Sequence, residues 1–185
     1  VTSLAGRGHM VLRNEAFDVR AGIEGPVLAR LDRGALAAFG VIAHGVHVNG
    51  FVRRADGLHL WVGWRSRGKS VAPGQIDHVV AGGVPAGLTP GETLVKEAAE
   101  EASIPPELAA AARPVGRVSY VMATGEGLRR DVLHCYDLDL PEGFVPRPHD
   151  DEVERFELWP AAELMREVRD ADRVKFNVNL VLIDF

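Results

Sequence analysis

An acidic helix with well-defined ends is the feature that most constrains the fold of this chain. The segment Thr89-Pro90-Gly91-Glu92 has the pattern of a capping box, with proline at the first helical position. The pair Pro105-Pro106 cannot continue the hydrogen bonds of a helix. The sequence therefore predicts a helix that begins at Pro90 and ends before Pro105.

Three carboxylates gather on one side of this helix. Glu97, Glu100 and Glu101 are three and four residues apart, so their side chains lie over one another. Like charges at this spacing destabilise an exposed helix by roughly 0.2–0.5 kcal/mol per pair. A divalent cation removes that repulsion, and carboxylate oxygens suit Mg²⁺ or Mn²⁺. A solvated acidic surface is the simpler alternative for an isolated pattern of this kind.

The neighbouring residues favour the metal interpretation. Apolar residues fall mainly on the other side of the helix, at Val95, Ala98, Ala99 and Ala102. We therefore expect the helix to pack through this side and to hold its acids on the polar side. Upstream, the glycines of Ala81-Gly82-Gly83 allow the backbone to approach a ligand closely. Together the two segments predict a metal-assisted phosphate site.

These segments resemble the signature of the Nudix hydrolases. In that signature a glycine, here Gly82, precedes a conserved pattern in which arginine and three glutamates lie on one helix. Three positions depart from it: Leu88 stands in place of the first glutamate, Lys96 in place of the arginine and Ser103 in place of a late glycine. In the family the first glutamate and the arginine help to brace the loop against the helix. The rigidity of the loop and the catalytic efficiency are therefore open questions.

Further segments are similar to one Nudix subgroup, the domain related to thiamine pyrophosphokinase-associated proteins. They are residues 47–50, 61–69, 73–77, 115–120, 127–131 and 136–141. The similarity covers roughly residues 41–185, so we expect a Nudix domain there and, in residues 1–40, the tail of an N-terminal domain or extension. It implies hydrolysis of thiamine diphosphate, or of its damaged or oxidised analogues, to the monophosphate.

The resemblance also implies roles for individual residues. Glu97 and Glu101 are expected to bind Mg²⁺ or Mn²⁺, with Glu100 as a third ligand or the base. The carbonyl of Ala81 corresponds to a further ligand in some family members. Glu152, in an acidic segment before the last strand, is the candidate for an additional metal ligand. A solvated acidic loop explains Glu152 equally well.

Substrate contacts are expected from five residues. Lys69 offers a positive charge to a diphosphate, and Trp61 and Tyr120 offer faces on which a cationic heterocycle can stack. Ser119 and Asp77 are polar residues in apolar segments, and buried polar groups need partners. The alternatives are a solvated lysine, aromatic rings in the core and polar groups with structural partners.

Other functions remain open. A nucleoside diphosphate derivative such as ADP-ribose is an alternative substrate, and a Nudix module that binds a diphosphate without turnover is a third interpretation. Metal binding by His44 and His47 together is a weaker alternative, because residues three apart on a strand point to opposite faces.

The rest of the chain alternates strands and helices. Strands are expected at residues 41–53, 58–65, 76–80, 117–122, 132–138 and 156–159, with short strands at 11–12 and 27–28, and helices at 106–112, 160–169 and 176–183. Asp56-Gly57 is a favoured hairpin turn between the first two long strands. This order predicts an α/β fold, specifically the Nudix α/β/α sandwich with a mixed central sheet.

Composition limits the partners and the location. A chain of 185 residues fits one domain, and its formal charge of −5 argues against a nucleic-acid surface. No apolar run is long enough to span a bilayer, and no signal-peptide pattern opens the sequence. The lone Cys135 is expected to be a core thiol. We expect a cytoplasmic protein with a small-molecule diphosphate as partner and without nucleic acid or membrane; a homodimer is left open.

Overall fold

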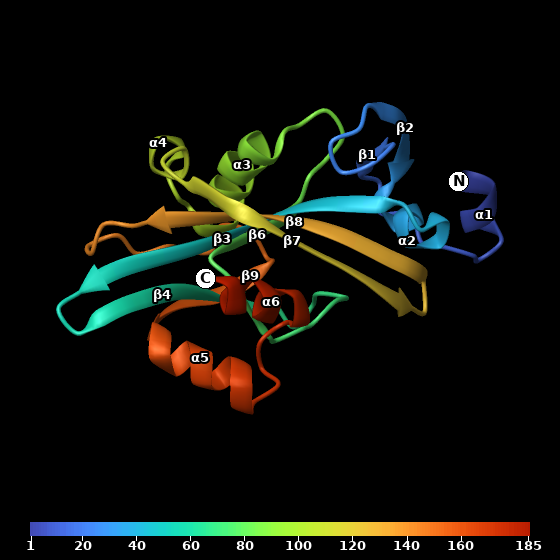
Figure 1. Ribbon diagram of the computed structural model, residues 1–185. Helices are drawn as coiled ribbons and strands as arrows, with labels where there is room; N and C mark the ends of the chain where they lie inside the picture. The colour runs from blue at the N-terminus through green and yellow to red at the C-terminus, as the bar shows by residue number, and fades with distance from the viewer.

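The computed structural model describes residues 1–185, and the long strand β3 (Ile42–Arg54) lies at its centre (Figure 1). Along one edge β3 pairs in parallel with β8 (Gly127–Asp139). Along the other edge it pairs antiparallel with β6 (Val80–Gly83) and then with β4 (Gly57–Arg65). Because β3 is long, two different strands share its second edge.

Three more strands complete a mixed sheet of seven. β7 (Arg113–Thr124) pairs antiparallel with β8, while β5 (Ile76–His78) and β9 (Val153–Pro160) both pair antiparallel with β4. The main path through the sheet runs β5-β4-β3-β8-β7.

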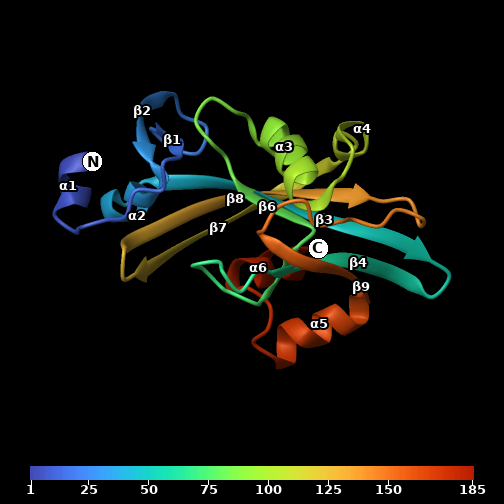
Figure 2. The same ribbon diagram turned by 180° about the vertical axis from the view of Figure 1, so that it is seen from behind.

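Helices cover both faces of this sheet (Figures 1 and 2). On one face lie α3 (Pro90–Ala102) and α4 (Pro106–Ala109), and on the other lie α5 (Ala161–Asp170) and α6 (Phe176–Asp184). The predicted α/β/α sandwich with a mixed central sheet is confirmed.

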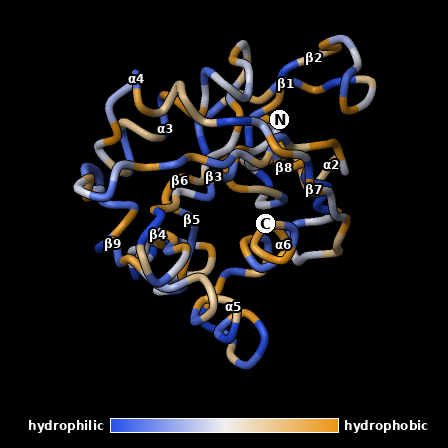
Figure 3. The backbone as a smooth tube through the Cα atoms, turned by 60° about the vertical axis from the view of Figure 1, so that its left-hand side comes forward, coloured by the Kyte–Doolittle hydropathy of each residue, from blue (hydrophilic) through white to orange (hydrophobic).

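Each face has its own core. Under α3 the buried apolar residues include Val48, Trp61, Val79, Val80, Leu94, Ala98 and Ile104. Under α5 and α6 they include Phe51, Leu60, Ile76, Leu164 and Val178. α6 is apolar over most of its length, as its colour shows (Figure 3), and it buries Val178, Val181 and Leu182. Cys135 is buried and free, as expected.

The acidic helix begins and ends as predicted. The Thr89 hydroxyl accepts a hydrogen bond from the Glu92 amide at 3.2 Å, and the Glu92 carboxylate accepts one from the Thr89 amide at 2.8 Å. After Ala102, Ser103 adopts a left-handed conformation with φ +53°, which normally favours glycine. Its hydroxyl donates to the carbonyl of Arg147 at 3.0 Å and ties the helix end to a distant loop.

The predicted strand at residues 76–80 is two strands. The chain pairs with β4 as β5, passes through Val79, and then pairs with β3 as β6. Val79 is fully buried, and a Cβ at Gly50 would lie 2.5 Å from its side chain. The missing Cβ of Gly50 therefore makes room for the crossing.

The N-terminal residues form five small elements. They are α1 (Thr2–Gly6), β1 (Ala16–Arg20), β2 (Val27–Asp32), the 3₁₀ turn η1 (Arg33–Ala35) and α2 (Leu36–Phe39). β1 and β2 pair antiparallel as a separate two-stranded sheet, called here the N-terminal hairpin (residues 16–32). The expected strand at residues 11–12 is wrong, and β1 was not predicted. No helix is long and apolar enough to cross a membrane.

Thr89→Ala tests the helix cap. Losing the hydroxyl leaves the Glu92 amide without its acceptor, so we expect the free energy of unfolding to fall by about 1 kcal/mol. For a chain of this size that lowers Tm by roughly 2–4 °C, which thermal unfolding followed by circular dichroism measures. Thr2→Ala, at the exposed start of α1, is the control. Equal Tm values for the two variants would contradict a stabilising cap.

Candidate active site

Glu97 lies directly against the backbone of β6. A Cβ at Gly82 would stand 2.7 Å from the carboxyl carbon of Glu97, so only glycine allows the helix and strand to approach this closely. The Glu97 side chain is 16% exposed. Burial raises the pKa of this carboxyl, although the neighbouring ammonium of Lys96 offsets part of the effect.

Glu101 joins the same helix to the strand by a hydrogen bond. Its carboxylate accepts from the Ala81 amide at 3.0 Å, and the residue is 7% exposed. Burial raises the pKa of Glu101 well above its usual range, and the negative charges of Asp77, Glu97 and Glu152 add to the shift. The hydrogen bond from Ala81 opposes the shift without cancelling it.

The position of Glu101 corrects the expectation that all three acids project from the polar side of the helix. Glu101 is buried together with Leu94, Ala98 and Ala102, while Glu100 is exposed. The polar edge of β6 passes this side of α3 and supplies a backbone donor there. A carboxylate can therefore occupy a position that the apolar pattern of the helix does not mark.

Lys96 contacts the other two acids. Its ammonium lies 3.1 Å from a Glu97 oxygen and 2.5 Å from a Glu100 oxygen. The hydrogen bond to Glu100, together with that to Glu97, raises the pKa of Lys96 to about 12. The ammonium thus marks a place between two carboxylates where positive charge is strongly favoured.

These features fit a divalent metal. The donors are all oxygen, which suits Mg²⁺ or Mn²⁺, and Gly82 leaves open the space into which the Glu97 carboxylate projects. The half-buried Glu97 and the buried Glu101 both have raised pKa values, so both gain from a compensating cation. Glu97, Glu100 and Glu101 are the side chains that would hold the metal, beside the backbone of Ala81. Such an ion supplies Lewis acidity toward phosphate and lowers the pKa of bound water.

A second group of charges centres on Asp77. Its carboxylate lies 2.7 Å from the Arg65 guanidinium and 2.8 Å from the Lys175 ammonium, and its other oxygen accepts from the His78 amide at 3.0 Å. Burial alone would raise the pKa of Asp77, but Lys175 and the other nearby positive charges hold it well below its usual range. The expected substrate contact is therefore occupied by protein groups, and Asp77 orients two cations.

Glu152 and Lys69 join two loops near these charges. The Lys69 ammonium lies 2.6 Å from a Glu152 oxygen, and the Ser66 amide donates to the Glu152 carbonyl at 2.9 Å. The charges of both Glu152 and Asp77 act on Glu101. The structure thus brings two of the predicted substrate residues and the predicted late acid within electrostatic range of the acidic helix.

Two other predicted residues lie elsewhere. Trp61 is 8% exposed and packs in the core beneath α3, so its ring is not available for stacking in this structure. Ser119 is exposed on β7, and successive residues of a strand point to opposite faces. Ser119 and Tyr120 therefore cannot contact the same part of a ligand through their side chains.

Tyr120 lies on the α6 face of the sheet. Its ring meets that of Phe176 edge-on, with centroids 5.4 Å apart, and its hydroxyl donates to Asp131. Burial raises the pKa of Tyr120, and Asp131 raises it further, while the positive charge of Arg129 acts in the opposite direction. Tyr120 is thus half-buried beside the start of α6, where Phe176 is 54% exposed.

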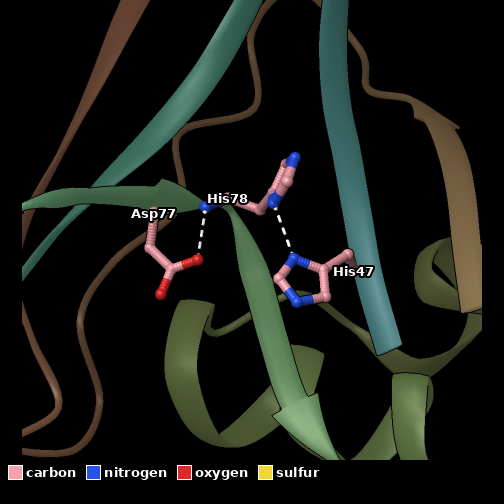
Figure 4. Close-up of side chains that lie close together, drawn as sticks. All are labelled: His47, Asp77 and His78. Carbon is pink, nitrogen blue, oxygen red and sulfur yellow. Dashed lines mark hydrogen bonds between the residues drawn. The ribbon is translucent and has the colours of Figure 1, made fainter. Parts of the chain in front are cut away.

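A buried histidine pair lies next to Asn177. Figure 4 shows the two rings of the pair, His47 and His78, beside Asp77. His47 and His78 face each other through their Nδ1 atoms at 2.8 Å, and the Asn177 amide nitrogen lies 3.4 Å from His47 Nε2. Burial lowers the pKa of His78 to about 4 and that of His47 well below its usual value, so both rings are neutral near pH 7. The side chain of His44 points to the face of β3 opposite to that of His47. It contacts His134 instead, with ring nitrogens 3.1 Å apart.

The pair and Asp77 together offer three metal-ligand atoms within 4.8 Å of one another. However, Asp77 already binds two cations, so a divalent ion beside it would be repelled by the excess positive charge. The two histidines are therefore better described as neutral hydrogen-bonding groups. The sequence did not identify this cluster, although His47 and Asn177 stand out as polar residues within apolar segments.

The matched family model decides the family. The model of the NUDIX domain matches residues 43–179, which is most of the chain. The chain belongs to the Nudix family. Its acidic helix α3 and the glycines of β6 are the family signature seen in three dimensions, with Leu88, Lys96 and Ser103 as local departures.

Two plant proteins are similar along nearly the whole chain. Nudix hydrolase 20, chloroplastic, of Arabidopsis thaliana is 46% identical over 94% of this chain, and Nudix hydrolase 24, chloroplastic, of the same plant is 44% identical over 94%. These matches cover 46% and 48% of the two plant proteins. The chain therefore spans about half the length of the curated relatives it matches.

The expected cytoplasmic location is wrong, because these similar proteins are chloroplastic. The absence of a signal-peptide pattern was too weak a ground for that expectation. Among solved structures, a Deinococcus radiodurans protein superimposes with a TM-score of 0.69, covering 92% of this chain and 98% of its own. It is 22% identical in sequence, and this likeness concerns the fold.

Glu101→Gln tests the electrostatic description of the buried acid. If the pKa of Glu101 is higher in the folded than in the unfolded protein, folding favours the protonated form of the acid. The protonated carboxyl therefore contributes most to stability below about pH 4, and this contribution is lost as the pH rises. At pH 7 in EDTA we expect the variant to have a free energy of unfolding about 1 kcal/mol higher than that of the parent. This corresponds to a Tm higher by a few degrees. This difference should shrink toward pH 4.

Differential scanning fluorimetry across pH 4–8 measures the effect. Glu107→Gln, an exposed acid in the first turn of α4, is the matched control and should show no such trend. A difference between Glu101→Gln and the parent that is independent of pH would argue against a raised pKa at Glu101.

Proposed function

We propose that the chain is a metal-dependent pyrophosphohydrolase that cleaves the diphosphate linkage of thiamine diphosphate, or of its damaged or oxidised analogues, to give the monophosphate. The required metal is Mg²⁺ or Mn²⁺. The substrate class rests on the Nudix subgroup that residues 41–185 resemble, and the chemistry rests on the arrangement of α3 against β6.

One observation carries the hydrolase proposal. Glu97 and Glu101 are held against the β6 backbone, at Gly82 and Ala81, with pKa values raised by burial. Removing one acid fully and a second acid partly from water at one strand edge is costly unless a cation compensates their charges. This cost favours a site maintained for metal binding over an acidic surface.

Positive charges near Glu101 suit a diphosphate. Arg65 and Lys175 are held by Asp77, and Lys69 is held by Glu152. Arginine and lysine neutralise phosphate oxygens, and ion pairs with acids keep these side chains in place until a substrate binds. We assign to Lys69, Arg65 and Lys175 the binding of the phosphate that does not react.

The heterocycle would lie toward α6. Tyr120 and the exposed Phe176 offer aromatic faces. A flat cationic thiazolium matches such aromatic faces. The same groups also accommodate a nucleobase, so the alternative of ADP-ribose requires a direct comparison.

Turnover across a substrate panel tests the proposal. Thiamine diphosphate, its oxidised analogues, ADP-ribose and nucleoside diphosphates are each incubated with the protein and Mg²⁺, and monophosphate products are separated by chromatography. We expect release of the monophosphate mainly from the thiamine series and its loss in EDTA. Hydrolysis of ADP-ribose alone would keep the Nudix chemistry and reject the thiamine assignment.

Glu101→Gln and Glu107→Gln extend this test to the residues. We expect the first to lower kcat by roughly a hundredfold or more, because an ionisable metal ligand is lost, and the second to match the parent. Isothermal titration with Mg²⁺ and with thiamine diphosphate supplies an independent measurement. Binding without turnover of any substrate would favour the non-catalytic diphosphate-binding module.

A further inference from the structure

The N-terminal hairpin (residues 16–32) holds the loop that leads into the acidic helix. This loop, residues 84–89, connects β6 with α3. Its Ala86 amide donates to the Ala16 carbonyl at 2.8 Å, and its Gly87 amide donates to the Asp18 carboxylate at 3.2 Å. Two successive backbone donors of the loop are thus satisfied by β1.

Asp18 is itself fixed from two sides. The Arg30 guanidinium, from β2, lies 3.1 Å from one oxygen, and the Arg20 guanidinium lies 3.6 Å from the other. The Asp18 side chain is only 10% exposed. A carboxylate held in this way is a charged acceptor of defined position, and hydrogen bonds to charged acceptors are stronger than those between neutral groups.

The hairpin also contacts the start of the loop. Phe17 is 3% exposed, and a Cβ at Gly83 would lie 2.5 Å from the tip of its ring. Gly83 directly follows Gly82, against which Glu97 packs. A displacement of the hairpin would therefore reach the backbone that positions Glu97.

The loop has few internal restraints of its own. Leu88 has no charge to offer, and its amide bonds only to the nearby Pro85 carbonyl at 3.2 Å. Lys96 is engaged by Glu97 and Glu100 on the helix itself. On α3 the Glu92 carboxylate binds Thr89, at the end of the loop. In the middle of the loop the charged contact comes from the hairpin, where Asp18 accepts from Gly87.

We infer that Asp18 is a positioning residue for hydrolysis. By holding the Gly87 amide it fixes the loop, and through the loop it fixes the approach of β6 to Glu97 and Glu101. The N-terminal hairpin then contributes to catalysis by holding this loop in position. This role rests on the proposed hydrolysis, but it does not depend on which heterocycle the substrate carries.

Asp18→Ala, Asp18→Asn and Glu24→Gln test this role. Asp18→Ala removes the acceptor for Gly87, whereas Asp18→Asn retains an oxygen that can accept. Glu24 is a matched control, because it lies in the same hairpin and forms an ion pair with Arg117 while its side chain is 79% exposed. All three variants are compared at equal concentrations of folded protein, determined by thermal unfolding.

The expected pattern separates positioning from simple stabilisation. We expect Asp18→Ala to lower kcat about tenfold or more, since misplacing a reacting group by about 1 Å can cost that much. KM should change less, because the cations held by Asp77 and Glu152 are untouched. Asp18→Asn should recover most of the activity, and Glu24→Gln should match the parent.

Hydrogen exchange keeps the test independent of the substrate. In Asp18→Ala the amides of Ala86 and Gly87 should exchange at least about tenfold faster than in the parent, while the α6 amides stay unchanged. The inference is overturned if Asp18→Ala lowers only Tm and leaves kcat and these exchange rates at parental values. It is equally overturned if Glu24→Gln causes the same loss.

Discussion

The hydrogen bond between the Glu101 carboxylate and the Ala81 amide is the contact on which the arrangement of the site depends. It joins the acidic helix to a strand edge that would otherwise leave a backbone donor without a partner. It also places a carboxylate in a position where burial strongly disfavours its charge. The same contact therefore positions the helix and keeps a carboxylate out of water. A bound cation would reduce the electrostatic cost of burying that charge.

Glycine at two positions makes this arrangement sterically accessible. Gly82 allows Glu97 to lie against β6, and Gly83 allows Phe17 to close over the next residue. One glycine thus faces the acidic helix and the other faces the N-terminal hairpin. The short strand β6 is held between these two contacts, so changes on either side are transmitted to the carboxylates through a few backbone atoms.

Local features were predictable from the sequence because local physics determines them. The capping box at Thr89 and the end of α3 follow from neighbouring residues, and the turn at Asp56-Gly57 connects the strands as expected. The side chains that meet in the site were harder to predict from the sequence. Asp77 meets Lys175, which lies 98 residues away in sequence, and Trp61 is buried because α3 covers it. Such pairings depend on the tertiary arrangement, which helix or strand periodicity does not encode.

The N-terminal hairpin illustrates the same limit. Its strand β1 has weak periodicity, and residues 1–40 were predicted as the tail of another domain, a division that stays a prediction. Yet Phe17 is only 3% exposed, and it packs on β6, the strand against which Glu97 also lies. A segment with little sequence signal can still be tightly restrained when the restraint comes from elsewhere in the fold. Leu88 offers no charge in this loop, and the carboxylate of Asp18 binds the neighbouring Gly87 amide from a different part of the chain.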